Sequence, residues 1–147
     1  MLCKYKVSKQ EMLLLRIISE MVECPAGCFL MGSPKDEWGR NCYIKDQEFE
    51  SQHLVAITKP FKIGKYPVTI EIYGGITGNS LVSSCKEINN NHPVSDISYK
   101  EAKKFCRKLN SLLDKTKIAK CLIPENYHFD LPTEAQWEYA CRARNDI

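Results

Sequence analysis

The chain carries, at residues 129–143, the sequence FDLPTEAQWEYACRA, and this stretch decides how the fold is expected to be built. Thr133 and Gln136 stand three residues apart and form a capping box, which satisfies the first free backbone amides of a helix. A helix is therefore predicted to begin at Thr133. Apolar residues at helical spacing predict its buried face, anchored by a tryptophan, and the opposite face carries an ion pair one turn apart. The buried positions are Trp137, Ala140 and Cys141, and the pair is Glu138 and Arg142.

The composition is that of one ordinary globular domain. The chain has 147 residues, of which 44% are hydrophobic and 27% charged, and its net charge of +3 gives no argument for a nucleic-acid partner. No apolar run is long enough to span a membrane. The run Met12–Ile18 follows several lysines, but Arg16 interrupts it and no small-residue cleavage site follows. We therefore expect a cytoplasmic location and no secretion.

Eight cysteines are present, but no C-x-x-C pair occurs, which argues against a zinc ribbon. Cys24 and Cys28 bracket a Pro-Ala-Gly turn and could reach a common metal ion or form a disulfide. No second ligand pair with zinc-like spacing follows them, so free thiols are the favoured interpretation. Cys106 and Cys141 are predicted to lie on the apolar faces of their helices, as core residues and not as nucleophiles.

Two further capping boxes predict helices upstream. Ser8 with Glu11 predicts a helix over residues 8–20, and Ser98 with Glu101 predicts one from Ser98 to Leu113. The outer face of the second helix is basic and is expected to be a solvated surface more than a binding site for nucleic acid. Its members are Lys100, Lys103, Lys104, Arg107 and Lys108.

Strands are predicted between these helices. A short apolar strand should follow the Pro-Ala-Gly turn at residues 28–31, alternation at residues 54–59 predicts a second, and residues 61–63 should resume it after Pro60. The remaining segments give weaker signals, which predict a short helix capped by Thr69 and ended by Gly74 and Gly75, an irregular loop from Gly74 to Asn91, and a linker over residues 114–127.

Several kinds of catalytic site have no support in the sequence. His53, His92 and His128 are far apart and lack metal-binding spacing, so each is interpreted as a structural residue. The glycines at 74, 75 and 78 lack the context of a phosphate-binding loop. Glu134 and Glu138 lie one turn apart on one helix, which does not suit the opposed carboxylates of a glycosidase.

Four segments in order resemble successive landmarks of the formylglycine-generating enzyme family, whose domain is also called the sulfatase-modifying factor domain. They are MVECPAGCFLMGSP, QHLVAITKPFKIGKYPVTIEIY, NHPVSDISYKEAKKFCRKL and FDLPTEAQWEYACRA. The LPTEAQWEYA block is the most specific of the four. The resemblance runs from Met21 to Ala143, so residues 1–20 are expected to form a helical N-terminal extension and residues 21–147 the N-terminal portion of a family domain.

The resemblance implies an α+β fold of the C-type-lectin-like kind, with two main helices and a small twisted antiparallel sheet, incomplete in this chain. It also implies the family activity, in which a cysteine of a sulfatase-type substrate is oxidised to formylglycine with molecular oxygen and copper(I) bound by a cysteine pair. Calcium sites are a further family feature. Relatives of the same domain include iron-dependent sulfoxide synthases and modules without assigned chemistry.

The sequence departs from the family pattern after Arg142, and this limits which functional residues can be assigned by resemblance. The family continues past the WEYA helix into Tyr-Pro-Trp-Gly and Gly-Gly-Ser-Trp segments and then the copper-binding cysteines, none of which follows Arg142. No catalytic, cofactor-binding or metal-binding residue is therefore assigned, and no cofactor is expected in this chain. We expect a part of the domain that is inactive alone and whose partner is a complementary C-terminal half or a substrate protein, not nucleic acid or a membrane. Whether any enzymatic activity survives stays open, and the alternatives are a non-catalytic lectin-like binding module or a decayed gene fragment.

Overall fold

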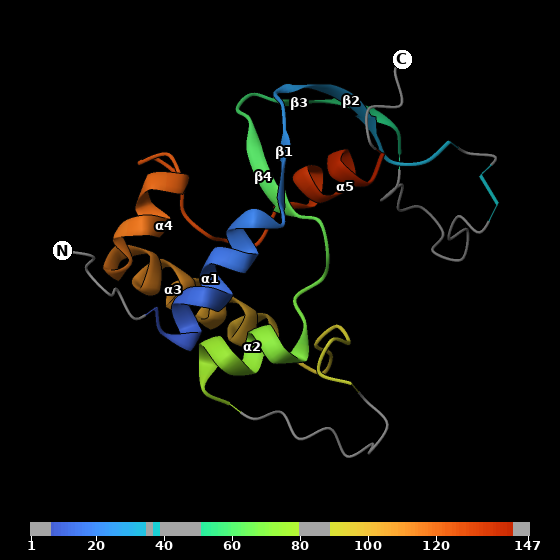
Figure 1. The fold of residues 1–147 in the computed structure, drawn as a ribbon. Helices are drawn as coiled ribbons and strands as arrows, with labels where there is room; N and C mark the ends of the chain where they lie inside the picture. The colour runs from blue at the N-terminus through green and yellow to red at the C-terminus, as the bar shows by residue number, and fades with distance from the viewer. Residues whose placement is uncertain (1–6, 35–36, 39–50, 80–88, 143–147) are drawn as a thin grey trace. The chain divides into compact units, whose positions relative to one another are not determined.

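The computed structural model describes residues 7–34, 37–38, 51–79 and 89–142 (Figure 1). Helices and short strands are mixed along the described chain, which makes the fold α+β, as predicted. Within the described part, no helix combines the length and the apolar content needed to cross a membrane. The elements follow one another as α1 (Lys9–Ser19), β1 (Met21–Cys24), β2 (Gly27–Met31), β3 (His53–Ile57), β4 (Phe61–Gly64), α2 (Ile70–Thr77), α3 (Tyr99–Lys115), α4 (Lys117–Leu122) and α5 (Glu134–Arg142).

The chain divides into two compact units, each built from two separate stretches of sequence. Unit 1 combines Met1–Val22 with Gly64–Leu131, and unit 2 combines Glu23–Ile63 with Pro132–Ile147. The paired strands β1 and β4 both run across this boundary. Unit 1 therefore holds α1 to α4, and unit 2 holds the β2–β3 pair and α5.

Unit 1 is a helical body around one apolar cluster. Its helices start where the capping boxes predict: the backbone amide of Glu11 donates to the Ser8 hydroxyl, and Ser98 and Glu101 repeat this geometry at α3. Leu14 is fully buried at the centre of the cluster. The buried members come from all four helices and from the segment after α4: Leu13, Leu14, Ile72, Tyr73, Ile76, Phe105, Cys106, Leu109, Leu113, Ala119 and Phe129.

Helix α2 is longer than predicted. It runs through Gly74 and Gly75 to Thr77 and ends at Gly78, whose φ of 76° is the left-handed conformation that glycine adopts readily. A Cβ atom on Gly75 would lie 2.3 Å from Leu13 Cδ1, so this glycine permits close packing of α1 on α2. The prediction that Gly74 and Gly75 end the helix and begin a loop was wrong, because Gly75 lies inside the helix and makes room there for Leu13 of α1.

The predicted linker over residues 114–127 is also partly helical. Helix α3 extends to Lys115, and α4 follows directly with Ala119 fully buried against unit 1. Thr116, the residue before α4, makes no side-chain capping bond and instead donates its hydroxyl to the carbonyl of Leu112. The usual start signal of a helix is therefore missing, and burial of Ala119 in tertiary packing determines the element.

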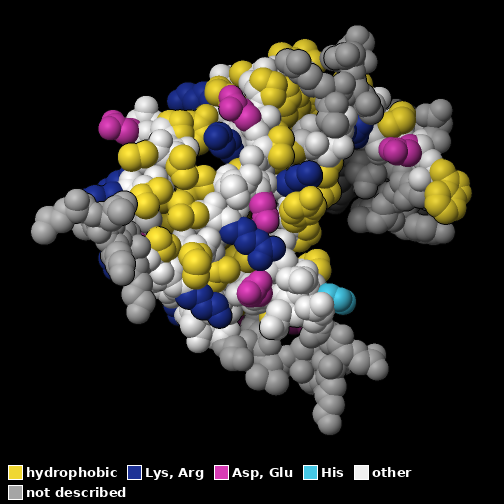
Figure 2. All heavy atoms as spheres, in the orientation of Figure 1, with side chains coloured by type: hydrophobic (Ala, Val, Ile, Leu, Met, Phe, Trp, Pro, Cys, Tyr) yellow, Lys and Arg dark blue, Asp and Glu magenta, His cyan; other side chains and the backbone are white. Residues whose placement is uncertain are grey.

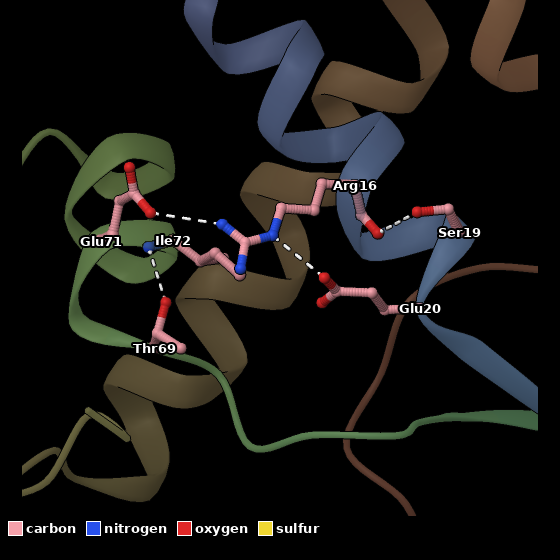
Figure 3. Close-up of polar contacts among 6 residues, drawn as sticks. All are labelled: Arg16, Ser19, Glu20, Thr69, Glu71 and Ile72. Carbon is pink, nitrogen blue, oxygen red and sulfur yellow. Dashed lines mark hydrogen bonds and ion pairs between the residues drawn. The ribbon is translucent and has the colours of Figure 1, made fainter. Parts of the chain in front are cut away.

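Polar contacts tie the helices of unit 1 together at its surface. The Arg16 guanidinium lies between Glu20, at 3.0 Å from Nε to Oε1, and Glu71, at 3.3 Å from Nη1 to Oε2 (Figure 3). Ser19 donates its hydroxyl to the Arg16 carbonyl at 2.8 Å. Arg16 thus connects α1 with the first turn of α2, through exposed ion pairs of the kind that stabilise a protein only weakly.

The basic face of α3 is only partly solvated. Lys103 Nζ lies 2.5 Å from Asp130 Oδ1, and the Lys108 ammonium donates to the carbonyl of Thr77. Lys100, Lys104 and Arg107 are exposed as predicted. The prediction of a fully solvated stripe was therefore too simple, since two of its lysines hold neighbouring segments of unit 1.

Unit 2 contains a small sheet and one helix. Strands β2 and β3 pair antiparallel, with Phe29 opposite Val55 and Gly27 opposite Ile57. The strands predicted at residues 28–31, 54–59 and 61–63 are confirmed, each with slightly different ends, whereas β1 was not predicted. Helix α5 follows Thr133 as expected, because the Gln136 amide donates to the Thr133 hydroxyl at 3.2 Å and the Thr133 amide donates to Gln136 Oε1 at 2.9 Å.

The predicted buried face of α5 is confirmed only at Ala140, which packs against the buried cluster of unit 2, and is wrong at Trp137 and Cys141. Trp137 is 58% exposed and Cys141 is exposed, while Tyr139 is only 4% exposed. The Tyr139 ring packs against the rings of Phe29 and Phe61, with distances between ring centroids of 5.3 Å and 6.3 Å. A helix of nine residues carries apolar side chains on more than one side, and the aromatic residues of the strands decide which side is buried.

Candidate functional site

The turn after β2 and helix α5 meet in unit 2 through both backbone groups of Gly32. The Gly32 amide donates to Glu138 Oε1 at 2.8 Å, and Arg142 Nη2 donates to the Gly32 carbonyl at 2.6 Å. Arg142 Nε also lies 2.7 Å from Glu138 Oε1. Together these three residues form what we call the Gly32 clamp.

The Gly32 clamp depends on a backbone conformation that favours glycine. Gly32 has a φ of 94°, which is strained for a residue with a side chain. The side chains of Arg142 and Glu138 are 37% and 21% exposed, so their hydrogen bonds are only partly open to competition from water. Hydrogen bonds to charged groups contribute roughly 1.5 to 3 kcal/mol each, more than neutral ones. The clamp therefore fixes where the chain leaves β2.

The sequence predicted the ion pair but not its role. Glu138 and Arg142 stand one turn apart, and that spacing alone indicates a local pair on the helix surface. The bonds to Gly32 join positions more than 100 residues apart in sequence. The sequence signal for this contact was Gly32 itself, in the Met31-Gly32-Ser33 turn. A glycine in a turn indicates an unusual backbone conformation but does not identify the residues that bind it.

Tyr139 reaches the backbone of β2 at a second glycine. A Cβ atom on Gly27 would lie 2.7 Å from the Tyr139 hydroxyl oxygen, so only glycine leaves room for this ring. The hydroxyl is buried and has no hydrogen-bond partner among the described residues. A buried polar group without a partner costs about 1 to 3 kcal/mol relative to a satisfied one. Tyr139 is thus well packed by its ring and unsatisfied at its oxygen.

Both contacts join the two most specific motifs of the sequence, the Pro-Ala-Gly to MGS segment and the WEYA helix. A family model for the sulfatase-modifying factor enzyme 1-like domain, FGE-sulfatase, matches residues 8–146. The chain belongs to the FGE-sulfatase family. The predicted resemblance is therefore confirmed. The match begins at residue 8, so it takes in α1, which the sequence had placed in an extension outside the family domain.

A solved FGE-sulfatase-like structure is also similar. The structure of PvdO from Pseudomonas aeruginosa superimposes with a TM-score of 0.60 at 28% sequence identity. The match covers 84% of this chain and 47% of the PvdO chain. This FGE-sulfatase chain therefore spans about half the length of that structure. A comparison with curated proteins gave no match.

The cysteines of this FGE-sulfatase chain were tested as ligands for the copper(I) that its family resemblance implies. Cys24 packs against the aromatic cluster of unit 2, while Cys28 is exposed on the opposite side of β2 from Phe29. The two thiols therefore do not converge, contrary to the metal or disulfide alternative. Burial raises the pKa of the Cys24 thiol and of the Cys106 thiol, which disfavours the thiolate that binds metals.

The other described ligand types do not supply a metal site either. Cys121 and Cys141 are exposed on α4 and α5, and Cys3, Cys42 and Cys85 lie outside the described residues. Among the residues that are described, no three His, Cys, Asp or Glu side chains gather closely enough to hold a metal ion. The described residues therefore do not fit the family's copper centre.

The structure gives hydrogen bonds for two of the three histidines, His53 and His92. The His53 ring nitrogen Nδ1 lies 2.9 Å from the carbonyl oxygen of Ser51, two residues earlier in the sequence. His92 contributes its backbone carbonyl, which accepts a hydrogen bond from the Ile70 amide at the start of α2. His53 belongs to unit 2, whereas His92 and His128 belong to unit 1.

Proposed function

We propose that this chain is a scaffold portion of an FGE-sulfatase protein-cysteine oxidase and is inactive alone. One observation carries the proposal: the polar side chains of the signature helix α5 hold the fold together. Gln136 closes the cap with Thr133, and Glu138 and Arg142 bind Gly32. A carboxylate and a guanidinium bound in this way position backbone and are not available as acid, base or ligand.

The chemistry is then supplied by a second polypeptide. We propose that the complementary partner carries the cysteine pair that binds copper(I) and that the substrate is a protein cysteine converted to formylglycine. The desolvated thiols of Cys24 and Cys106 support this division, because copper(I) requires thiolates.

The finer features of the family belong to the same proposal. They are a C-type-lectin-like arrangement of the assembled domain, calcium bound by the assembly, and a location in the cytoplasm. The free thiols of the described cysteines support that compartment.

The test is reconstitution with a defined probe, the segment of an active formylglycine-generating enzyme that follows its own WEYA helix and carries its copper-binding cysteines. We call it the cysteine-pair segment. The purified chain, the segment and their mixture are each incubated with copper(I), oxygen and a sulfatase peptide that contains the substrate cysteine. Formylglycine is measured by aldehyde labelling and mass spectrometry. Product from the mixture alone is expected, whereas product from this chain alone, or none from the mixture, would contradict the proposal.

A further inference from the structure

The chain between α4 and α5 contains no helix or strand (Figure 1). Its last residues are fastened to α3 by two side chains. The Phe129 amide donates to Asn110 Oδ1 at 2.7 Å, and Asn110 Nδ2 donates to the Phe129 carbonyl at 2.9 Å. Next to this contact, Lys103 Nζ lies 2.5 Å from Asp130 Oδ1. We call residues 129–131 the α3 latch.

The α3 latch has few other attachments. In the described part of the chain, its residues make no backbone–backbone hydrogen bond to another element. The Phe129 side chain is 9% exposed and belongs to the buried cluster of unit 1, against which Leu131 packs in part. Asp130 is exposed, and Figure 2 shows acidic side chains beside basic ones at several places on the visible face, so its ion pair is a weak attachment by itself. Asn110 is therefore the main polar attachment of the latch.

We infer that the α3 latch opens as one unit while unit 1 stays folded, and that Asn110 limits how often it opens. Opening breaks the contacts of Asn110 and Lys103 and exposes one large buried side chain, that of Phe129. Unfolding of unit 1 exposes every member of its cluster, so the local opening requires much less free energy. Helix α3 keeps its own capping box and its packing on α1 and α2 when the latch is open.

The latch lies where the chain leaves unit 1. Leu131 is followed by Pro132 and by Thr133, the cap of the signature helix α5. The closed latch therefore anchors the chain that leads to this helix, and the open latch releases it. The latch belongs to unit 1 alone and is independent of the proposed function.

Cys106 gives the opening a built-in reporter. It lies on α3 between Lys103 and Asn110, one turn from each, and is buried in the same cluster as Phe129. Opening of the latch should therefore uncover its thiol. Two signals follow the opening in the full chain: hydrogen exchange of the Phe129 amide, measured by NMR, and alkylation of Cys106 by N-ethylmaleimide, measured by peptide mass spectrometry. Both rates should change little with urea below the unfolding transition, because a local opening exposes little surface.

The test variant is Asn110→Ala, and its matched control on the same helix is the exposed Ser111→Ala. Asn110→Ala should speed the alkylation of Cys106 by about tenfold or more, because both hydrogen bonds to Phe129 are lost. Ser111→Ala should leave that rate unchanged. In both variants the exposed Cys121 should react at the wild-type rate, and circular dichroism verifies that the helices remain.

A rate of Cys106 alkylation that rises with urea as steeply as global unfolding would overturn the inference, and so would a rate that a folded Asn110→Ala leaves unchanged. If Asn110→Ala unfolds the chain, Lys103→Gln decides, with the exposed Lys100→Gln as its control. Lys103→Gln removes only a partly exposed ion pair and should speed the alkylation by about two- to fivefold. Equal rates in these two lysine variants would show that the latch does not open as a unit.

Discussion

Unit 1 and unit 2 differ in how far each covers its own apolar side chains. In the described residues, unit 1 packs four helices around the fully buried Leu14 and Ala119. Unit 2 buries Phe29, Ile57, Phe61 and Tyr139 between α5 and the short strands β2, β3 and β4, and it leaves Leu30 and Leu54 exposed. The difference indicates that unit 1 covers its apolar core more completely than unit 2 does.

The polar contacts of the two units also differ, in how far they are exposed to solvent. Unit 1 uses exposed pairs such as Arg16 with Glu20, which fasten a core that is already closed. Unit 2 uses the partly buried Gly32 clamp, which supplies a larger share of the stability of a smaller body. Removing an apolar residue should therefore harm unit 1 most, and removing a polar residue should harm unit 2 most.

The largest expected effect is that of Leu14→Ala. Because the side chain is fully buried, its loss should lower the free energy of unfolding by about 2 to 5 kcal/mol. Urea unfolding followed by far-ultraviolet circular dichroism reports mainly the helices of unit 1, and Met12→Ala is an exposed control on the same helix. Both tryptophans, Trp38 and Trp137, lie in unit 2, so their fluorescence should shift less. Equal shifts of the two signals would break the comparison.

The Gly32 clamp should give the next largest effect. Glu138→Gln leaves the Arg142 guanidinium and the Gly32 amide poorly paired and should cost about 1 to 3 kcal/mol in tryptophan-detected unfolding. A double-mutant cycle with Arg142→Gln should give a coupling energy of about 1 to 3 kcal/mol, in the upper part of the range for residues in contact. The matched cycle of Arg16→Gln and Glu20→Gln on unit 1 should give less, about 0.2 to 1 kcal/mol. Equal couplings would remove the proposed contrast in polar contacts.

Tyr139→Phe should act in the opposite direction. It removes an unsatisfied buried hydroxyl and keeps the ring contacts with Phe29 and Phe61, so unit 2 should become more stable by about 1 kcal/mol. Tyr139→Leu, which loses the aromatic packing as well, should destabilise it. A destabilising effect of Tyr139→Phe would show that the hydroxyl makes a hydrogen bond in the folded chain.

The smallest effect is the pH dependence of unit 1. Hydrogen bonds from Ser8 and Ser98 lower the pKa of Glu11 and Glu101, and the Lys103 ammonium lowers the pKa of Asp130. A folded-state pKa below the unfolded value means that the unfolded state binds protons more tightly. This stability is therefore complete above the ordinary carboxyl range of about 4 and is lost as pH falls through the lowered values.

Acid unfolding of unit 1, followed by circular dichroism, should show this dependence. Asp130→Asn should reduce the slope of the unfolding free energy against pH below about 4, and Asp114→Asn should leave it nearly unchanged because that residue is largely exposed. Identical slopes for wild type and Asp130→Asn would contradict this account.

The helix starts and the strands could be predicted from the sequence, whereas the tertiary contacts between distant residues could not. The capping boxes at Ser8, Ser98 and Thr133 place three helix starts correctly, because both partners of each box lie within one turn. The strands followed from alternation. In contrast, Gly75 and Ala119 have roles that depend on Leu13 and the core of unit 1, and those contacts are not encoded near them.

The candidate site shows the same limit. The ion pair of Glu138 and Arg142 was predictable from its spacing. The hydrogen bonds of the pair to Gly32 were not, because they depend on the tertiary fold. Trp137 was expected to anchor α5 because it is the largest apolar residue of the helix. Tyr139 does so instead, since the rings of Phe29 and Phe61 and the space above Gly27 accept it.

The interleaving of the units sets the order in which they can form during translation. All of unit 1 has been synthesised once Leu131 has been added, whereas unit 2 still requires α5, which starts at Glu134. Strands β2 and β3 leave the ribosome long before the helix that they pack against. Nascent strands without cover are exposed to aggregation and to chaperones. The interval between β3 and α5 is thus the step of biogenesis at which this chain is most vulnerable.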